Sequence, residues 1–68
     1  MKITFDKEAD AVYIEFSKGK FNSNKKIDDN TIIDLDEKKN ILGIELLDVS
    51  KRISKDFLSN ISVESLTP

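Results

Sequence analysis

The sequence predicts a small α+β domain, in which an antiparallel β-meander of four to five strands is covered on one face by a C-terminal helix. Apolar and polar residues alternate in several short segments between residues 2 and 47, which is typical of strands with one buried face. Short links join these segments, whereas parallel strands need crossovers of about a dozen residues or more. After Leu47 the apolar spacing changes to every fourth residue, which indicates an amphipathic helix.

Length and composition indicate one domain that needs support from outside its own core. The chain has 68 residues, and we expect a single domain over residues 1–60 and a tail over residues 61–68, either frayed or forming a short extra strand. Cysteine and histidine are absent, which excludes disulfides and thiolate or imidazole metal sites. Since a core of this size rarely supplies more than about 3–5 kcal/mol, we expect association with another protein chain.

A hairpin is predicted at the N-terminal end, with strands over residues 2–6 and 11–17 and a turn at residues 7–10. The carboxylates of Asp6 and Asp10 are suited to accept hydrogen bonds from nearby backbone N–H groups in this turn. The period of two places the apolar side chains of both strands on one face. These side chains are Ile3, Phe5, Val12, Ile14 and Phe16.

A polar third strand is predicted over residues 24–27, after a connection in which Gly19 can supply a positive φ angle. The strand carries Lys25 and Lys26 next to Ile27. Lysines are a common guard of exposed sheet edges. We therefore expect an edge strand, which a turn at residues 28–30 follows.

The two strongest strands are predicted over residues 31–36 and 41–47, as a hairpin that residues 37–40 close. Asn40 is the residue of this turn best suited to the left-handed region. The core-facing side chains of the hairpin are Ile33, Leu35, Leu42, Ile44 and Leu46. Gly43 interrupts the second strand, and a glycine there often marks a bulge or a close backbone approach.

The helix that should cover this apolar face begins near residue 49. Its apolar stripe comprises Val49, Ile53, Phe57, Leu58 and Ile61. Asp48 or Ser50 is suited to cap its start, and Ser54 to cap a second start after a break near residues 53–54.

Three sequence blocks, FDKEADAVYI at residues 5–14, IDLD at 33–36 and LGIELLDVSKR at 42–52, resemble a known family. It is the small bacterial and archaeal domain-of-unknown-function family numbered 2283, and the resemblance extends over residues 3–53. It implies a short antiparallel sheet followed by a helix, and no established activity. It also implies an antitoxin-like, protein-binding role, because some family genes resemble partners in toxin–antitoxin-like pairs. Lys39 stands where members often have a turn glycine.

Composition argues against several function classes. Thirteen acidic against 11 basic residues make a net charge of −2, which does not suit a general nucleic-acid binder. The lysines at positions 18, 20, 25 and 26 have only Phe21 nearby for base stacking. No apolar run approaches the ~18–20 residues of a membrane span, and no signal-peptide core precedes the first strand. We therefore expect a cytoplasmic protein that binds neither membranes nor nucleic acid, and the family resemblance implies a prokaryotic one.

Catalytic residue types are also missing. No histidine is present to activate a serine, so we expect a protein that is not an enzyme and uses no cofactor. The outer sheet face is the candidate interaction surface, because apolar residues interrupt its polar pattern. That surface comprises Tyr13, Ile32, Ile41, Gly43 and Leu47.

An acidic cluster on the same outer face is the second candidate. Alternation places Asp34, Asp36 and Glu45 there, near Tyr13, and carboxylates can hold a hard cation. A polar outer face is also what an antiparallel sheet with one covered side normally has. We therefore favour a protein–protein interaction module, as a homodimer, an antitoxin-like partner-binding domain or both. The alternative is a metal- or small-ligand-binding domain that uses the acidic face.

Overall fold

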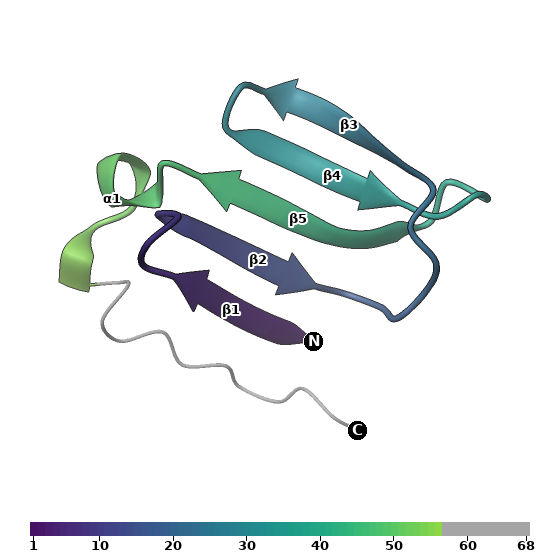
Figure 1. Cartoon of the computed structure of the whole chain (residues 1–68), viewed down its shortest axis with the longest axis horizontal. Helices are drawn as coiled ribbons and strands as arrows, with labels where there is room; N and C mark the ends of the chain where they lie inside the picture. The colour runs from purple at the N-terminus through teal and green to yellow at the C-terminus, as the bar shows by residue number, and fades with distance from the viewer. Residues whose placement is uncertain (57–68) are drawn as a thin grey trace.

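The computed structural model describes residues 1–56 as one five-stranded antiparallel sheet that a short helix follows (Figure 1). In chain order the elements are β1 (Lys2–Asp6), β2 (Ala11–Glu15), β3 (Ser23–Asp28), β4 (Thr31–Leu35), β5 (Ile41–Leu47) and α1 (Val49–Arg52). None of the helices in this part of the chain is long and apolar enough to cross a membrane. The domain is thus mostly β, and the helical part of the predicted α+β fold is small.

The predicted hairpins are confirmed, but the predicted meander is wrong. β1 pairs with β2, and β4 pairs with β5. The strand order is β1-β2-β5-β4-β3, so β5 lies between β2 and β4 instead of at an edge. β5 is the longest strand at seven residues and is rich in apolar side chains, which suits a central position with both edges paired. The lysine-containing β3 lies at the edge, as predicted.

The link over residues 16–22 makes this order possible, because it crosses the ends of β5 and β4 to reach β3 (Figure 1). The Leu42 carbonyl oxygen accepts hydrogen bonds from the backbone N–H groups of Phe16 and Ser17, at 2.8 and 3.2 Å. At its other end the Asn22 N–H donates to the Leu35 carbonyl oxygen at 2.9 Å. Phe16 belongs to this link and is 46% exposed, so its predicted core position is wrong.

The strand register defines two faces. On the first, which we call the apolar face, Ile3, Ile14, Ile44 and Ile33 stand directly opposite one another across β1, β2, β5 and β4. We call these four residues the isoleucine row. On the second, the Tyr13 face, a row with the order Thr4, Tyr13, Glu45 and Ile32 crosses the same strands. Residues directly opposite each other in an antiparallel pair point to the same side, so each row lies on one face.

A β-bulge changes the position of Leu42. The register between β4 and β5 shifts between Asp34 and Leu35, and one extra residue in a strand turns the following side chains to the other face. Leu42 is 7% exposed and lines a hollow with Tyr13 and Asp34. It therefore does not share the apolar face of Ile44 and Leu46, as alternation alone predicted.

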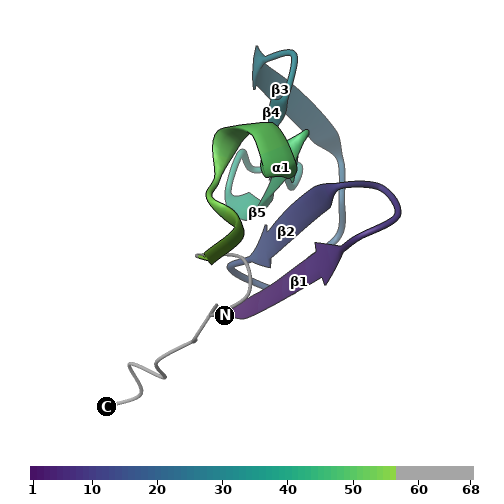
Figure 2. The same cartoon turned by 90° about the vertical axis from the view of Figure 1, so that its left-hand side faces the viewer.

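Within residues 1–56, the predicted covering helix is represented by the single turn of α1. α1 ends after Arg52, because Ile53 adopts an extended conformation with φ −129° and ψ 138°, which confirms the predicted break. Four residues at about 1.5 Å each span ~6 Å, whereas four strand spacings of about 4.8 Å span ~19 Å. Figure 2 accordingly shows α1 in front of β5 at one end of the sheet. The other residues of the predicted stripe, Phe57, Leu58 and Ile61, lie outside the described residues, as does the predicted tail.

The core is correspondingly small. Val12, Leu42 and Val49 are the buried hydrophobic residues of the described part of the chain, at 5%, 7% and 0% exposure. Val49 begins α1, and its backbone N–H donates to the Asp10 carbonyl oxygen at 3.1 Å. Val12 and Val49 are therefore buried near the junction of β2, β5 and α1, whereas Leu42 is buried at the other end of β5, beside the link over residues 16–22.

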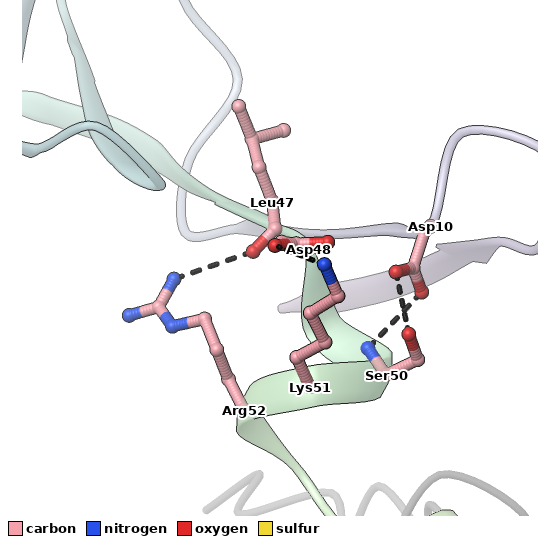
Figure 3. Close-up of polar contacts among 6 residues, drawn as sticks. All are labelled: Asp10, Leu47, Asp48, Ser50, Lys51 and Arg52. Atoms are coloured by element: carbon pink, nitrogen blue, oxygen red, sulfur yellow. Dashed lines mark hydrogen bonds and ion pairs between the residues drawn. The ribbon is translucent and has the colours of Figure 1, made fainter.

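The side chain that caps the N-terminal end of α1 belongs to Asp10, which is not adjacent to α1 in the sequence (Figure 3). Asp48 occupies the N-cap position in a left-handed conformation, and its side chain makes no capping hydrogen bond. Instead, Asp10 Oδ1 accepts from the Ser50 N–H at 3.1 Å and Asp10 Oδ2 from the Ser50 hydroxyl at 2.7 Å. On the far side of α1, Arg52 donates to the Asn30 carbonyl oxygen at 2.7 Å. These contacts attach α1 to two separate turns of the sheet.

Candidate functional site

The Tyr13 face brings together most of the residues that the sequence placed on an outer face. Glu45 lies between Tyr13 and Ile32 in one cross-strand row. In the neighbouring row Gly43 lies opposite Asp34. Leu47 pairs with Ala11, and it lines the same hollow as Tyr13, Asp34 and Glu45. The face is therefore mixed, with carboxylates set among an aromatic and two aliphatic side chains.

Gly43 permits the close approach of Tyr13. A Cβ atom built on Gly43 would overlap the Tyr13 hydroxyl group and would lie 2.7 Å from the Ile14 carbonyl oxygen. The φ angle of Gly43 is not positive, so a special backbone conformation does not require the glycine. The Tyr13 ring occupies the space of the missing side chain. This confirms the close approach that a glycine inside a strand indicates.

The Tyr13 ring brings its hydroxyl group near the carboxylates of Asp34 and Glu45. Burial raises the pKa of Glu45, and hydrogen bonding to Asp34 and the negative charge of Asp34 raise it further. Burial also raises the pKa of Tyr13, with Asp34 adding to the effect. The Asp34 Oδ1 atom is buried and has no hydrogen-bond partner within residues 1–56. Protonation of Glu45 thus relieves the repulsion between the carboxylates of Glu45 and Asp34.

Asp36 does not join these carboxylates, so the predicted acidic cluster of three is wrong. It follows the end of β4, and its Oδ1 atom accepts from the backbone N–H groups of Lys38 and Asn40 at 2.8 and 2.9 Å. Its Oδ2 atom accepts from the Asn40 side-chain amide at 3.0 Å. The hydrogen bonds from Asn40 lower the pKa of Asp36. Lys39, with φ 70°, occupies the left-handed position that was predicted for Asn40.

Ile41 lies apart from the other predicted contact residues. It begins β5 opposite Leu35, next to the register shift, and is 46% exposed. Phe16 and Phe21 stand at the same end of the sheet and are 46% and 55% exposed. Alternation could not find this grouping, because the bulge and the link over residues 16–22 create it.

The remaining polar candidates are not assembled into a site. Within the described residues there is no group of three or more acidic side chains that could hold a metal ion. The lysine run is divided: Lys25 lies opposite Ile33 and Lys26 opposite Ile32, which places the two on different faces. Lys18 and Lys20 lie in the link at the end of the sheet.

The apolar face is the larger feature, and its residues were predicted only as core. Its side chains are half-buried: Ile3, Phe5, Ile14, Ile33, Leu35, Ile44 and Leu46. α1 reaches this face at one end, because Arg52 donates to the Thr31 hydroxyl at 2.8 Å and Thr31 pairs with Leu46. Within residues 1–56 no second layer extends over the isoleucine row. Alternation predicted the face, and the short length of α1 shows that residues 49–56 cover it only at one end.

Comparison with known proteins identifies a family but no characterised relative. No curated protein matches the chain. No solved structure matches it. A family model described as "Protein of unknown function (DUF2283)" matches residues 2–50, which include all five strands and the start of α1. The chain therefore belongs to the DUF2283 family.

Proposed function

We propose that this domain functions by binding another protein chain through the apolar face of its sheet, and that it has no catalytic activity of its own. The observation that carries the proposal is the isoleucine row, four directly opposed side chains on a face that α1 covers only at one end. Sheets bury such faces against a second layer in stable domains. A partner chain would supply that layer.

The size of the core supports the same proposal. Three buried hydrophobic residues in the described part of the chain are few for a domain. Cysteine and histidine are absent, so neither a disulfide nor a metal ion bound by these residues can add stability. Burial of apolar surface contributes roughly 25 cal/mol per Å². Covering the apolar face would therefore stabilise the fold and the complex together.

The Tyr13 face is a second surface for a partner in this proposal. Tyr13 presents an aromatic ring beside Ile32 and Leu47, and tyrosine is enriched at protein interfaces because it joins apolar area to a polar group. The raised pKa of Glu45 makes binding at this face dependent on pH. The antitoxin-like role that the family resemblance implies is one form of such binding and stays a prediction.

Sedimentation equilibrium of the full chain, together with thermal unfolding over a wide range of protein concentration, tests the proposal. We expect association, and a melting temperature that rises with concentration because only the folded state associates. Ile3→Ser, on the edge strand β1, should weaken association. Ile27→Ser is the matched control, because Ile27 lies on the other edge strand and is 57% exposed. A monomer whose melting temperature is independent of concentration, and which Ile3→Ser affects no more than Ile27→Ser, would contradict the proposal.

A second candidate function rests on Asp34. Its buried Oδ1 atom lacks a hydrogen-bond partner in the described residues and lies at a hollow of ≈ 450 Å³ with Tyr13 and Glu45, a volume within the usual range of small-ligand pockets. We propose binding of a small cationic ligand as the alternative to protein association. Calorimetric titration with Mg²⁺, Ca²⁺ and Mn²⁺ tests it. Heat that Asp34→Asn abolishes supports the alternative, and no heat with any of the three cations argues against it.

A further inference from the structure

We infer that the chain covering the apolar face is a second copy of this chain, packed face to face with its strands reversed, so that the basic end of one sheet lies over the acidic end of the other. This inference rests on the proposed function, whose partner it identifies. It comes from the distribution of charge between the two ends of the sheet and from the position of α1.

The basic end is where β2 and β4 finish and where β1, β3 and β5 begin. Five lysines stand there against three carboxylates, which leaves an excess of positive charge. The lysines are Lys2, Lys18, Lys20, Lys38 and Lys39, and the carboxylates are Glu15, Asp36 and Glu37. The Asp36 carboxylate is engaged in its own turn by Lys38 and Asn40.

The acidic end is the opposite edge, where β1, β3 and β5 finish and α1 follows. Six carboxylates stand there against three basic side chains. The carboxylates are Asp6, Glu8, Asp10, Asp28, Asp29 and Asp48, and the basic residues are Lys7, Lys51 and Arg52. Lys51 lies 3.8 Å from Asp48, and the Arg52 guanidinium donates to the Asn30 carbonyl and the Thr31 hydroxyl. The two ends of the sheet therefore carry net charges of opposite sign, although the whole chain has a net charge of only −2.

Two symmetric ways of stacking the sheets differ in which ends meet. A two-fold axis parallel to the strands would place like ends over each other, whereas an axis across the strands reverses them. Like charges facing each other across an interface cost free energy and opposite charges fix the register. The charge distribution therefore favours the reversed arrangement, in which the apolar face supplies the affinity and the charged rims set the orientation.

The position of α1 favours the same arrangement. α1 contacts the apolar face at the acidic end, through Thr31, in the row that also contains Leu46 and Val12. In the reversed dimer each α1 would lie over the basic end of the partner sheet, which the partner's own α1 leaves open. Stacking like ends would instead bring the two α1 turns against each other.

The size of the face sets the concentration range of the test. Five strands at about 4.8 Å spacing, each with about five residues of ~3.4 Å, present a face of roughly 24 by 17 Å, or about 400 Å² in projection. Standard protein interfaces bury about 800 Å² of accessible surface on each partner. We therefore expect a dimer at the small end of the range, with a dissociation constant in the micromolar region.

Variants in which the charge at one end of the sheet is reversed test the inference. Lys18 and Lys20 in the link at the basic end would lie near the partner's turns that contain Glu8 and Asp29. All four side chains are exposed, and within residues 1–56 none of them makes a hydrogen bond or ion pair in the monomer. The two variants are Lys18→Glu with Lys20→Glu, and Glu8→Lys with Asp29→Lys. Their association is measured by sedimentation equilibrium of the full chain at low ionic strength, where surface charges are weakly screened.

Each variant alone should dimerise roughly tenfold more weakly than the wild type, since reversal turns attraction into repulsion at both ends of a symmetric dimer. An equimolar mixture should regain the affinity of the wild type, because both ends of the heterodimer then carry opposite charges. Native mass spectrometry should show the heterodimer as the main species. Circular dichroism of each variant confirms that it is folded.

Three results would overturn the inference. Tighter association of either single variant would indicate that like ends meet. Association that Ile3→Ser weakens but that neither charge variant changes would overturn the reversed dimer while leaving the proposed function standing. A monomeric wild type with a melting temperature independent of concentration would overturn both the reversed dimer and the proposed function.

Discussion

Asp10 binds Ser50 with both oxygens of its carboxylate, one to the backbone N–H at 3.1 Å and one to the hydroxyl at 2.7 Å (Figure 3). The two residues are 40 positions apart in the sequence. Asp10 closes the β1–β2 turn in a left-handed conformation with φ 53°, which directs its side chain to a helical turn that has no cap of its own. This pair fixes the junction at which Val12 and Val49 are buried.

Replacing Asp10 should therefore detach α1 from the sheet. We expect Asp10→Ala to lower the free energy of unfolding by about 1–2 kcal/mol, through loss of the cap and strain of alanine in the left-handed region. Asp10→Asn keeps one acceptor oxygen and tolerates that conformation, so its effect should be smaller. Urea unfolding provides the measurement, with Glu8→Ala in the same turn as the control. Equal losses for Asp10→Ala and Glu8→Ala would contradict the capping role.

Arg52 should contribute more to stability than its neighbour Lys51, although both are exposed and basic. Arg52 donates to the Asn30 carbonyl at 2.7 Å and the Thr31 hydroxyl at 2.8 Å, and so joins α1 to β4. The Lys51 side chain is 79% exposed, and its ion pair with Asp48 has a distance of 3.8 Å. Such exposed ion pairs contribute little to stability. We expect a loss of about 1 kcal/mol for Arg52→Ala and less than about 0.5 kcal/mol for Lys51→Ala, measured by urea unfolding. The reverse order would show that the bridge to β4 is unimportant.

Gly43 should tolerate no side chain. A methyl group there would overlap the Tyr13 hydroxyl and crowd the Ile14 carbonyl oxygen at 2.7 Å, and the backbone contact cannot yield as a flexible side chain does. We expect Gly43→Ala to lower the free energy of unfolding by about 1–3 kcal/mol, and Tyr13→Phe to recover part of the loss. Gly19→Ala is the control, because its new methyl group would meet only the flexible end of Leu42. Thermal unfolding that ranks Gly19→Ala as the more damaging change would refute this explanation.

The raised pKa of Glu45 makes stability depend on pH. Between the ordinary pKa of 4.5 and the raised pKa of the folded state, the folded chain binds more protons than the unfolded chain, so the free energy of unfolding falls as pH rises. Glu45→Gln should flatten this part of the profile and be more stable than the wild type at neutral pH. Thermal unfolding from acidic to neutral pH tests this, and Glu15→Gln serves as the charge-matched control on the same face. A wild-type profile that rises through this window, and that Glu45→Gln leaves unchanged, would rule out the effect.

Asp28 and Asp36 affect the free energy of unfolding in the opposite direction, and at lower pH than Glu45. Hydrogen bonds from Asn30 lower the pKa of Asp28, and those from Asn40 lower the pKa of Asp36. Their stabilising contribution is complete above the ordinary value of 3.8 and is lost as pH falls below it. Measurements on Glu45 are therefore best confined to pH values above this range.

The sequence alone determined the local structure of this protein. Alternation located four of the five strands, the lysines of β3 indicated the fifth, and the turn residues located both hairpins, because strand period and turn chemistry depend on neighbouring residues in the chain. The break after Arg52 and the edge position of the lysine-containing β3 followed from equally local features. The resemblance to the DUF2283 family was visible in three short blocks and covers most of these elements.

Which strands are neighbours and which side chains meet became apparent only in the folded sheet. β5 took the central position between β2 and β4, and the bulge next to Asp34 moved Leu42 to the other face. Each of these outcomes depends on pairing between segments far apart in the chain, which a periodic pattern does not encode. The same holds for the pairs Asp10–Ser50 and Tyr13–Gly43, whose contact requires the whole sheet to be in register.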